Sequence, residues 1–444
     1  MILKISSAAL AMLICAGAMQ AAATPGSTGA LAPLKSNPYY FQDAKGKPVW
    51  VAGDSTGAFS SYEFDYATCF DTLKANGLNF CRTWVCKGRE CSPDGKVTFY
   101  LAYQRPGPGI AKDGKPKCDL TKFNPAFFER LKAVCQAAKD RGIYLHLILL
   151  DAWNIKNKAP FGVNVYNLEN NINGVDADVN KDGDAKDPGE FCSLTNTGVL
   201  NVQKAFIKKV IDEVNHFDNI IFEIANENYY SKEWELYLCD YVKLCEKGKP
   251  VKHMVMPKDL PHHDYADIKT WNLPKLHAEL LKARNLKQPL IWCTDGIGEP
   301  DDSTVRKAVW TVFTSGGHAD YLDSSLSELG KNPTRPEMRA QYGYVAAFVK
   351  KLRFWEMTPD DGLVKSGSAY AIASKNELVA FLPSGGEVTL DLTKMNGKLS
   401  ARWFDPRTGK YNKESQINGG GLSKFKAPDE TDWALLVRKQ GTAK

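Results

Sequence analysis

The chain alternates between short apolar runs and longer amphipathic segments. Apolar runs of strand length lie at residues 49–52, 80–85, 143–150, 220–225, 254–256, 266–270, 290–293 and 319–322. Segments with helical periodicity separate most of them, at 64–76, 125–141, 199–217, 234–245, 273–285 and 305–314. Eight strands alternating with helices predict the α/β class and a (β/α)8 TIM barrel. A doubly wound sheet is the alternative, but no glycine-rich phosphate turn follows any strand.

The pattern changes beyond residue 358. A last helical segment at 335–355 ends the first domain, and short β-rich runs separated by glycine turns follow at 370–373, 378–382, 387–392, 399–404 and 433–437. These runs predict a small all-β sandwich. We therefore expect a barrel over 24–358 and a β-sandwich domain over 359–444.

The first 23 residues have the pattern of an export signal. A lysine precedes a short apolar run, and small residues at its end form a cleavage site. The run is too short to span a bilayer, and no later segment reaches the required length. We therefore expect a signal peptide over 1–23 and a secreted or periplasmic protein without a membrane span.

Composition argues against some classes of partner and leaves open whether the cysteines form disulfides. The net charge is +6 over 444 residues without a basic arm, which argues against nucleic acid as a partner. Ten of the eleven cysteines remain after removal of the signal, and an even number permits disulfides. Cys86 and Cys91 are a candidate short bridge, and buried free thiols are the alternative. Neither a CxxC pair nor a nearby histidine supports a zinc site.

Polar residues gather where the predicted strands end. The fourth strand is followed by Asn226 and Glu227, and the seventh by Asp295 and Glu299. In a barrel of this type the carboxyl ends of the strands face the substrate. Cleaving a glycosidic bond with retention needs two carboxyl groups about 5 Å apart. Strands four and seven of a closed barrel can supply such a pair, so Glu227 is a candidate catalytic acid and Asp295 or Glu299 a candidate second carboxyl group; the alternative is a Glu227 that caps the next helix or pairs with a lysine.

Other strand-end residues are candidates for binding the substrate. Arg82 is placed to lie beneath the nucleophile, and Glu223 shares the strand parity of Glu227, so it should point inward and orient Arg82 or form a structural ion pair. Aromatic side chains at these ends can stack on sugar rings, although most aromatics are core residues. The candidate set is Asp54, Arg82, Trp84, Asp151, Trp153, Asn226, Tyr229 and Trp271.

An acidic insertion resembles a calcium loop. Oxygen-bearing side chains alternate around a glycine, as in loops that bind Ca²⁺, and the candidate ligands are Asp178, Asn180, Asp182, Asp184 and Glu190. The alternative is a solvated acidic loop. Any such calcium would be structural, because the expected chemistry requires no cofactor.

Several stretches resemble a known family. Residues 38–48, 73–82, 219–227 and 306–316 resemble the apiosidase-like barrels, which are related to the clan-A glycoside hydrolases. Residues 403–410 and 427–433 resemble the small domain labelled "putative collagen-binding" in such proteins. The resemblance implies that Glu227 is the acid/base and the seventh-strand carboxylate the nucleophile. Clan-A enzymes carry Glu at that strand end, whereas this chain has Thr294 and Asp295, with Glu299 further on.

Two functions are consistent with these patterns. The first is a secreted glycoside hydrolase that cleaves a plant or microbial polysaccharide by a retaining double displacement. The second is a glycan- or matrix-binding protein on an inactive barrel, since fold and function separate readily. A collagen partner has no physical support in the residues themselves. The oligomeric state stays open.

Overall fold

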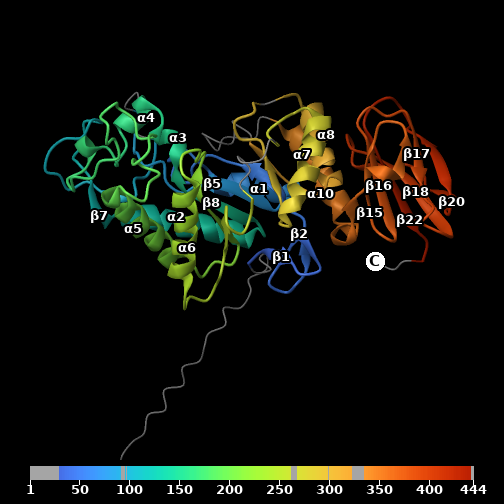
Figure 1. The fold of residues 1–444 in the computed structure, drawn as a ribbon, viewed down its shortest axis with the longest axis horizontal. Coiled ribbons are helices and arrows are strands. Elements are labelled where there is room, and N and C mark those ends of the chain that lie inside the picture. The colour runs from blue at the N-terminus through green and yellow to red at the C-terminus, as the bar shows by residue number, and fades with distance from the viewer. Residues whose placement is uncertain are drawn as a thin grey trace, which may run out of the picture.

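The computed structural model describes residues 30–91, 96, 98–261, 268–298, 300–322 and 335–441. The expected signal peptide lies outside the described residues. An α/β domain occupies one side of the molecule and an antiparallel β domain the other, as Figure 1 shows. Within the described chain, every helix is too short or too polar to cross a lipid bilayer.

A parallel sheet forms the centre of the α/β domain. Its seven described strands lie in the order β10 (Met254–Met256), β9 (Ile220–Asn226), β8 (Tyr144–Asp151), β5 (Phe80–Trp84), β4 (Ala52–Ser55), β12 (His318–Leu322) and β11 (Ile291–Cys293). The first barrel strand pairs with the last, β4 with β12, which is how a barrel closes. A doubly wound sheet would reverse its strand order instead. The domain is therefore TIM-barrel-like.

The predicted sixth strand, at residues 266–270, is not among the described strands of this sheet. Residues 266 and 267 lie outside the described residues, and 268–270 form a turn and loop rather than a strand. The described sheet consequently ends at β10 on one side and β11 on the other.

The predicted first strand was placed too early. Residues 49–52 are apolar because they lie beneath the barrel, where β3 (Pro48–Val49) pairs with β2 (Asn37–Gln42), which pairs with β1 (Ala32–Leu34). The barrel strand begins at Ala52 and continues to Ser55. Gly53 is required there, because a Cβ at this position would lie 1.8 Å from the Phe80 carbonyl oxygen of the neighbouring strand.

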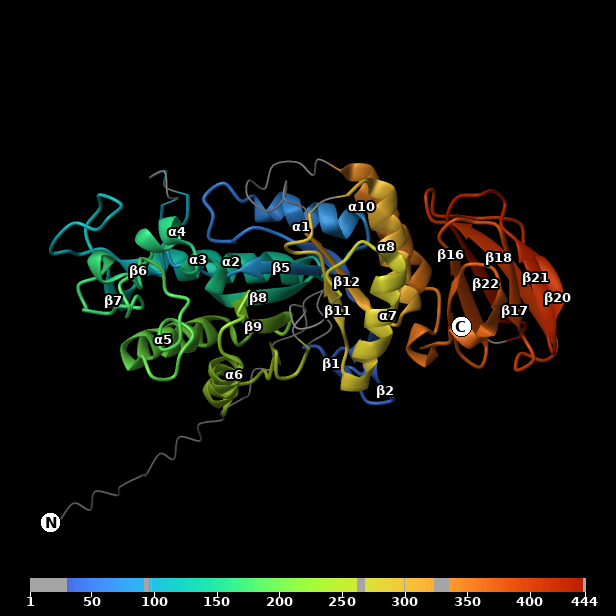
Figure 2. The same ribbon diagram turned by 45° about the horizontal axis from the view of Figure 1, so that its top comes forward.

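Helices flank the sheet, as Figure 2 shows. The main ones are α1 (Tyr66–Ala75), α2 (Pro125–Asp140), α5 (Thr197–Val214), α6 (Lys232–Glu246), α7 (Leu273–Ala283), α8 (Asp302–Thr314) and α10 (Pro336–Val349). Side-chain N-caps set where six of them begin, with Asp65, Asn124, Asn196, Ser231, Asn272 and Asp301 accepting from backbone N–H groups. Short elements build the long loops above the sheet, namely β6 (Tyr103–Gln104), β7 (Asp119–Phe123), α3 (Ala152–Ile155), α4 (Lys158–Gly162) and η1 (Leu168–Asn170).

The C-terminal domain consists of two antiparallel sheets around a shared apolar core. One contains β13 (Thr358–Pro359), β15 (Tyr370–Ala373), β16 (Glu377–Leu382), β22 (Trp433–Lys439), β18 (Lys398–Asp405), β19 (Lys410–Tyr411) and β20 (Ser415–Asn418). The other contains β14 (Val364–Ser366), β17 (Glu387–Asp391) and β21 (Leu422–Lys426). The core joins both sheets through residues such as Leu378, Leu390 and Leu435.

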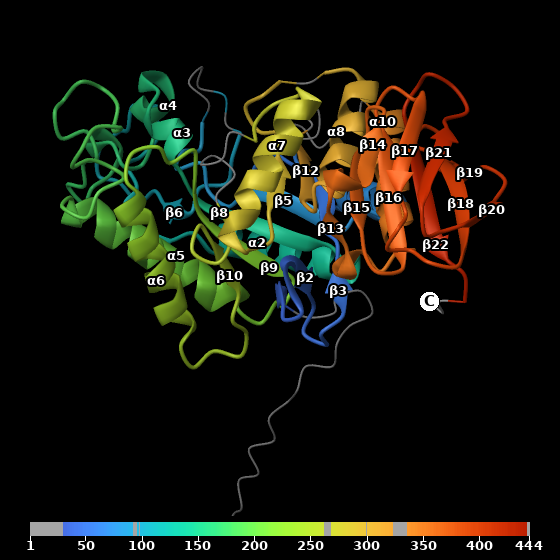
Figure 3. The same ribbon diagram turned by 45° about the vertical axis from the view of Figure 1, so that its right-hand side comes forward.

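Helices α8 and α10 join the two domains, and Figure 3 shows them beside the β domain. Trp310 of α8 stacks on Phe381 with ring centroids 5.6 Å apart and lies 5.6 Å from Phe404. Arg306 forms two hydrogen bonds to Asp432, at 2.8 and 2.6 Å. This interface is buried and apolar at its centre.

Candidate active site

A cleft of about 470 Å³ opens at the carboxyl ends of the barrel strands. This size is within the usual range for small-molecule sites. It is lined by Gly57, Ala58, Ser61, Glu63, Trp84, Lys87, Arg89, Lys96, Thr98, Phe99, Trp153, Asn154, Asn226, Glu227, Asp295 and Leu322. Five of the sequence-predicted site residues therefore meet in one cleft: Trp84, Trp153, Asn226, Glu227 and Asp295.

Arg82 links three strands beneath this cleft. It donates two 2.8 Å hydrogen bonds to Glu223, one of 3.0 Å to Asn226 Oδ1 and one of 3.1 Å to Asp295 Oδ2. Arg82 and Glu223 are almost completely buried. Burial opposes the charge on Arg82, but the neighbouring carboxylates of Glu223 and Asp295 hold its pKa well above the usual value. The guanidinium group thus fixes the floor of the cleft.

Glu227 follows β9 in an unusual backbone conformation. Its φ is +50°, in the left-handed region that a residue with a side chain adopts at a cost of about 1–3 kcal/mol. Its side chain lines the cleft, and Lys156 Nζ lies 2.6 Å from Oε2. Ser231, rather than Glu227, caps the next helix. Of the alternatives raised by the sequence, the lysine pair is therefore present and the helix cap is not.

Asp295 lies just beyond β11, on another side of the same cleft. It is mostly buried, and one carboxylate oxygen accepts from Arg82. Glu299, the other candidate nucleophile, lies outside the described residues. Asp295 is thus the seventh-strand carboxylate that the structure places in the cleft.

Two tryptophans contribute apolar surface. Trp84 lies under Lys87, whose Nζ is 4.2 Å from the ring centroid, and Trp153 is 40% exposed. Asp151 does not line this cleft. It accepts from the Trp153 backbone N–H at 3.0 Å and from Lys87 Nζ at 3.1 Å, so it positions its neighbours.

Besides Asp151 and Arg82, three more predicted binding residues do not line the cleft. Asp54 is fully buried in an ion pair with Arg339, 2.8 Å away, because β4 extends past it and places it within the sheet rather than at a strand end. Trp271 packs edge-on against Trp292 and donates its Nε1–H to a backbone carbonyl. Tyr229 is 55% exposed outside the cleft lining, with Lys156 5.7 Å from its ring.

Eleven of the sixteen lining residues were missed from the sequence. Lys87, Arg89, Lys96 and Phe99 among them come from the loop after β5. Such a loop has no periodicity from which side-chain direction can be inferred. Lys156, which contacts Glu227, was missed too, although it is the C-cap of the short helix α3 that contains Trp153.

A buried carboxyl group lies below the cleft floor. Asp320 on β12 is inaccessible to solvent and accepts a 2.6 Å hydrogen bond from Ser55 Oγ. Burial raises the pKa of Asp320 to about 7, although the nearby charge of Arg82 acts in the opposite direction. This carboxyl group therefore changes charge near neutral pH.

The acidic loop is held together by hydrogen bonds. Asp178 accepts from the backbone N–H groups of residues 182 and 183, and Glu190 accepts from those of 179, 180 and 187. Asn180 accepts from the N–H of Asp182, whose own carboxylate accepts from the N–H of Asp184. In the described part of the chain, no group of three or more acidic, cysteine or histidine side chains gathers as metal ligands. The loop's own hydrogen bonds order these oxygens, and calcium binding at the loop stays a prediction.

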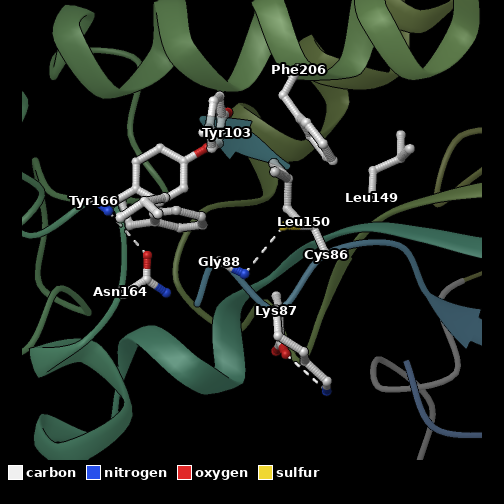
Figure 4. A pocket seen from close by; sticks show the side chains of 12 residues that line it. Cys86, Lys87, Gly88, Tyr103, Leu149, Leu150, Asn164, Tyr166 and Phe206 are labelled. Atoms are coloured by element: carbon white, nitrogen blue, oxygen red, sulfur yellow. Dashed lines mark hydrogen bonds and ion pairs between the residues drawn. The ribbon is translucent and has the colours of Figure 1, made fainter. Parts of the chain in front are cut away.

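The cysteines of the described residues are free thiols, Cys86 and Cys91 among them. Figure 4 shows Cys86 beside Leu150 at a second, much smaller pocket of about 20 Å³. Burial raises the pKa of Cys86 to about 11. Cys91 lies in a different contact, with its Sγ 3.8 Å from Asp113. The predicted short bridge is therefore absent.

Comparisons with known proteins agree on the fold. Residues 359–438 match a family model described as "Putative collagen-binding domain of a collagenase", and residues 89–257 match one described as "Domain of unknown function (DUF6298)". No curated protein matches the sequence.

Solved structures with a similar fold carry glycoside hydrolase titles. One titled "Glycoside hydrolase" has a TM-score of 0.66 at 14% identity, covering 95% of this chain and 99% of its own. A family 5 glycoside hydrolase from Bacteroides vulgatus has a TM-score of 0.64 at 14% identity, with 94% of each chain covered. A third, titled a "putative glycoside hydrolase" from the same species, has a TM-score of 0.67 at 13% identity, covering 94% and 83%. At these identities the likeness concerns the fold.

Proposed function

We propose that this protein is a glycoside hydrolase that works by a retaining double displacement, with Glu227 as acid/base and Asp295 as nucleophile. The observation that carries the proposal is the meeting of these two acids, from separate strand ends, in one solvent-accessible cleft above Arg82, which bonds Asp295 and the Asn226 that precedes Glu227. The fold of the similar structures and the motif resemblance to apiosidase-like barrels support it. The sixth strand of a closed barrel would fill the gap between β10 and β11.

The reaction would proceed in two steps. Asp295 attacks the anomeric carbon while Glu227 gives its proton to the leaving glycosidic oxygen, so the C–O bond breaks and a glycosyl ester forms. Glu227, now a carboxylate, then takes a proton from water. That water attacks the ester, restores Asp295 and releases a sugar with the original anomeric configuration.

Arg82 and Asn226 prepare the site for these steps. Arg82 holds Asp295 Oδ2, which leaves the other oxygen for attack. Asn226 accepts from Arg82 through its carbonyl oxygen, and this fixes its amide N–H₂ as a donor for a substrate hydroxyl group. The Trp84 Nε1–H has no hydrogen-bond partner in the described structure, and a sugar oxygen would satisfy it.

Lys156 must move during the cycle. Its ammonium group is 2.6 Å from Glu227 Oε2, so a leaving-group oxygen could not bind that carboxylate oxygen at the same time. Substrate binding would displace Lys156 toward solvent, where its side chain is already partly exposed. Lys156 is therefore a positioning residue of the free enzyme.

The alternative is a glycan-binding protein on an inactive barrel. The specific observation in its favour concerns Asp295. Its side chain is one methylene shorter than that of glutamate, and one of its carboxylate oxygens is bound by Arg82. In either case we expect an exported protein, and as a hydrolase it would cleave a plant or microbial polysaccharide.

The test is sugar release from a panel of plant and microbial glycans by wild type, Glu227→Gln and Asp295→Asn. Glu63→Gln is the matched control, since this acid also lines the cleft but pairs with exposed Lys96. We expect both catalytic variants to lose about 10²–10⁴-fold in rate or more, and the control less than about 10-fold. Equal activity of Glu227→Gln and wild type would rule out the assignment. Binding without release by any form would support the alternative.

A further inference from the structure

A second large hollow lies at the opposite end of the barrel from the cleft. It measures about 560 Å³ and is bounded by Trp50, Asn79 and Tyr144 at the amino ends of the strands, and by Asn376 and Arg438 of the β domain. The segment after α10, including Trp355, forms another wall. Figure 3 shows the β1–β3 sheet at this end of the barrel, below the first strands of the β domain. We call this hollow the basal groove.

Positive charge gathers in the basal groove without matching negative charge. Lys47, Lys350 and Lys351 all line it, and none has a carboxylate partner among the described residues. Lys350 Nζ is 2.8 Å from the Gly77 carbonyl oxygen, and Lys351 Nζ lies 5.5 Å from the Tyr411 ring. Three ammonium groups are thus held at one concave surface.

Two acids line the groove against five basic side chains, namely Lys47, Lys350, Lys351, Arg353 and Arg438. Glu377 accepts from Arg438 and from the Arg353 backbone N–H. Asp43 is buried and accepts from the backbone N–H groups of Lys45 and Lys47, so its charge offsets one of the positive charges. The lining keeps a formal excess of positive charge.

The cost of this arrangement is visible at Lys350. Burial lowers its pKa, and the charge of Lys47 lowers it further. Like charges repel, and a bound anion would relieve the repulsion between these lysines. The groove is therefore suited to a negatively charged ligand.

The basal groove continues onto the β domain. A neighbouring hollow of about 320 Å³ shares Lys351 and Arg438 with it and adds Arg402, Tyr411 and Glu414, whose carboxylate lies 3.9 Å from Arg402. The guanidinium carbon of Arg402 lies 4.5 Å from the Tyr411 ring centroid, and Trp355 is partly exposed in the first hollow. Cations alternating with aromatic faces along two joined hollows suit a chain of sugars that carries acidic groups, since the rings stack and the acids pair.

We propose that the basal groove and its continuation bind an acidic polysaccharide, with uronate carboxylates or sulfate esters as the recognised groups, at a distance from the catalytic cleft. This site would keep the protein on its polymer while the cleft acts elsewhere on it. The inference goes beyond the proposed catalysis and does not require that Glu227 be an acid.

The experiment is isothermal titration calorimetry with polygalacturonate and dextran sulfate, with neutral dextran for comparison. Lys47→Met/Lys351→Met removes two exposed charges of the groove, and Lys232→Met/Lys275→Met removes two exposed charges elsewhere. We expect the groove variant to bind an acidic polymer at least about 10-fold more weakly than wild type, and the control variant to bind like wild type. Neutral dextran should not bind this site.

Three outcomes separate this inference from the proposed function. If Glu227→Gln binds the acidic polymers as wild type does, the result supports a site outside the cleft. If Glu227→Gln no longer binds them, the inference is overturned. If both double variants bind the acidic polymers equally more weakly than wild type, the effect is one of general charge, and the inference is overturned too. Binding of single-stranded DNA but of neither acidic glycan would also refute it. Hydrolysis of a short glycoside, which cannot reach the groove, should be the same in wild type and groove variant.

Discussion

Asp320→Asn should change how stability depends on pH. In the folded chain burial raises the pKa of Asp320 to about 7, against an ordinary value of 3.8. The neutral carboxyl group is thus favoured by folding, and its contribution to stability is complete below about pH 4 and lost as the pH rises through about 7. The difference between the two values corresponds to about 4 kcal/mol as an upper limit. The amide of Asn cannot ionise and avoids this loss.

The free energy of unfolding of wild type and Asp320→Asn can be compared by urea titration at intervals from pH 4 to 8, followed by tryptophan fluorescence. At pH 4 the variant should be less stable by about 1 kcal/mol, because the Oδ1 of Asp320 has no hydrogen-bond partner in the described structure and an amide N–H there would also lack one. By pH 8 the variant should be the more stable protein.

Asp140→Asn, on the surface of α2, is the control and should give a curve parallel to wild type. Ser55→Ala removes the hydroxyl group whose hydrogen bond lowers the pKa of Asp320, so the loss of stability should continue to a higher pH than in wild type and be larger in total. A difference between wild type and Asp320→Asn that stays constant from pH 4 to 8 would refute the reasoning.

Three further predictions concern stability. Arg82→Met should lower the free energy of unfolding by about 3–5 kcal/mol, because Glu223 stays buried without its partner; an unchanged melting temperature would contradict this. Trp310→Ala should cost about 3–5 kcal/mol and expose the junction between the domains to limited proteolysis, whereas a cleavage pattern like that of wild type would argue against the interface. Calcium should raise the melting temperature and EDTA should reverse the rise if the acidic loop binds the ion, because Asp178 and Glu190 keep free lone pairs beside their backbone hydrogen bonds; an unchanged melting temperature would show a solvated acidic loop.

Much of the cleft could be predicted because strand parity and strand ends are local properties. Asn226, Glu227 and Trp84 follow from where two strongly apolar runs stop, and the Arg82–Glu223 contact follows from side chains that point inward. The prediction that Asp54 lines the cleft was wrong for the same reason. An error of a few residues in a strand boundary moves a side chain from the cleft to the sheet interior.

Other features could not be predicted because they depend on contacts between distant segments. The loop after β5 has no sequence periodicity from which the direction of its side chains can be inferred. Strands β20 and β21 are largely exposed and contain few apolar residues, so no apolar pattern predicts them. The basal groove brings together lysines at 47 and 350–351 with residues of the β domain. The sequence around each of these lysines does not indicate that they lie together in one groove.

The central claim is that Glu227 and Asp295 act together on one glycosidic bond. The most direct measurement follows the anomeric protons by ¹H NMR during hydrolysis of whichever glycan the wild-type protein cleaves. A first product with the anomeric configuration of the substrate, appearing with wild type and not with Glu227→Gln, is the predicted result. An inverted first product, or the same product formed as fast by Glu227→Gln, would contradict the account.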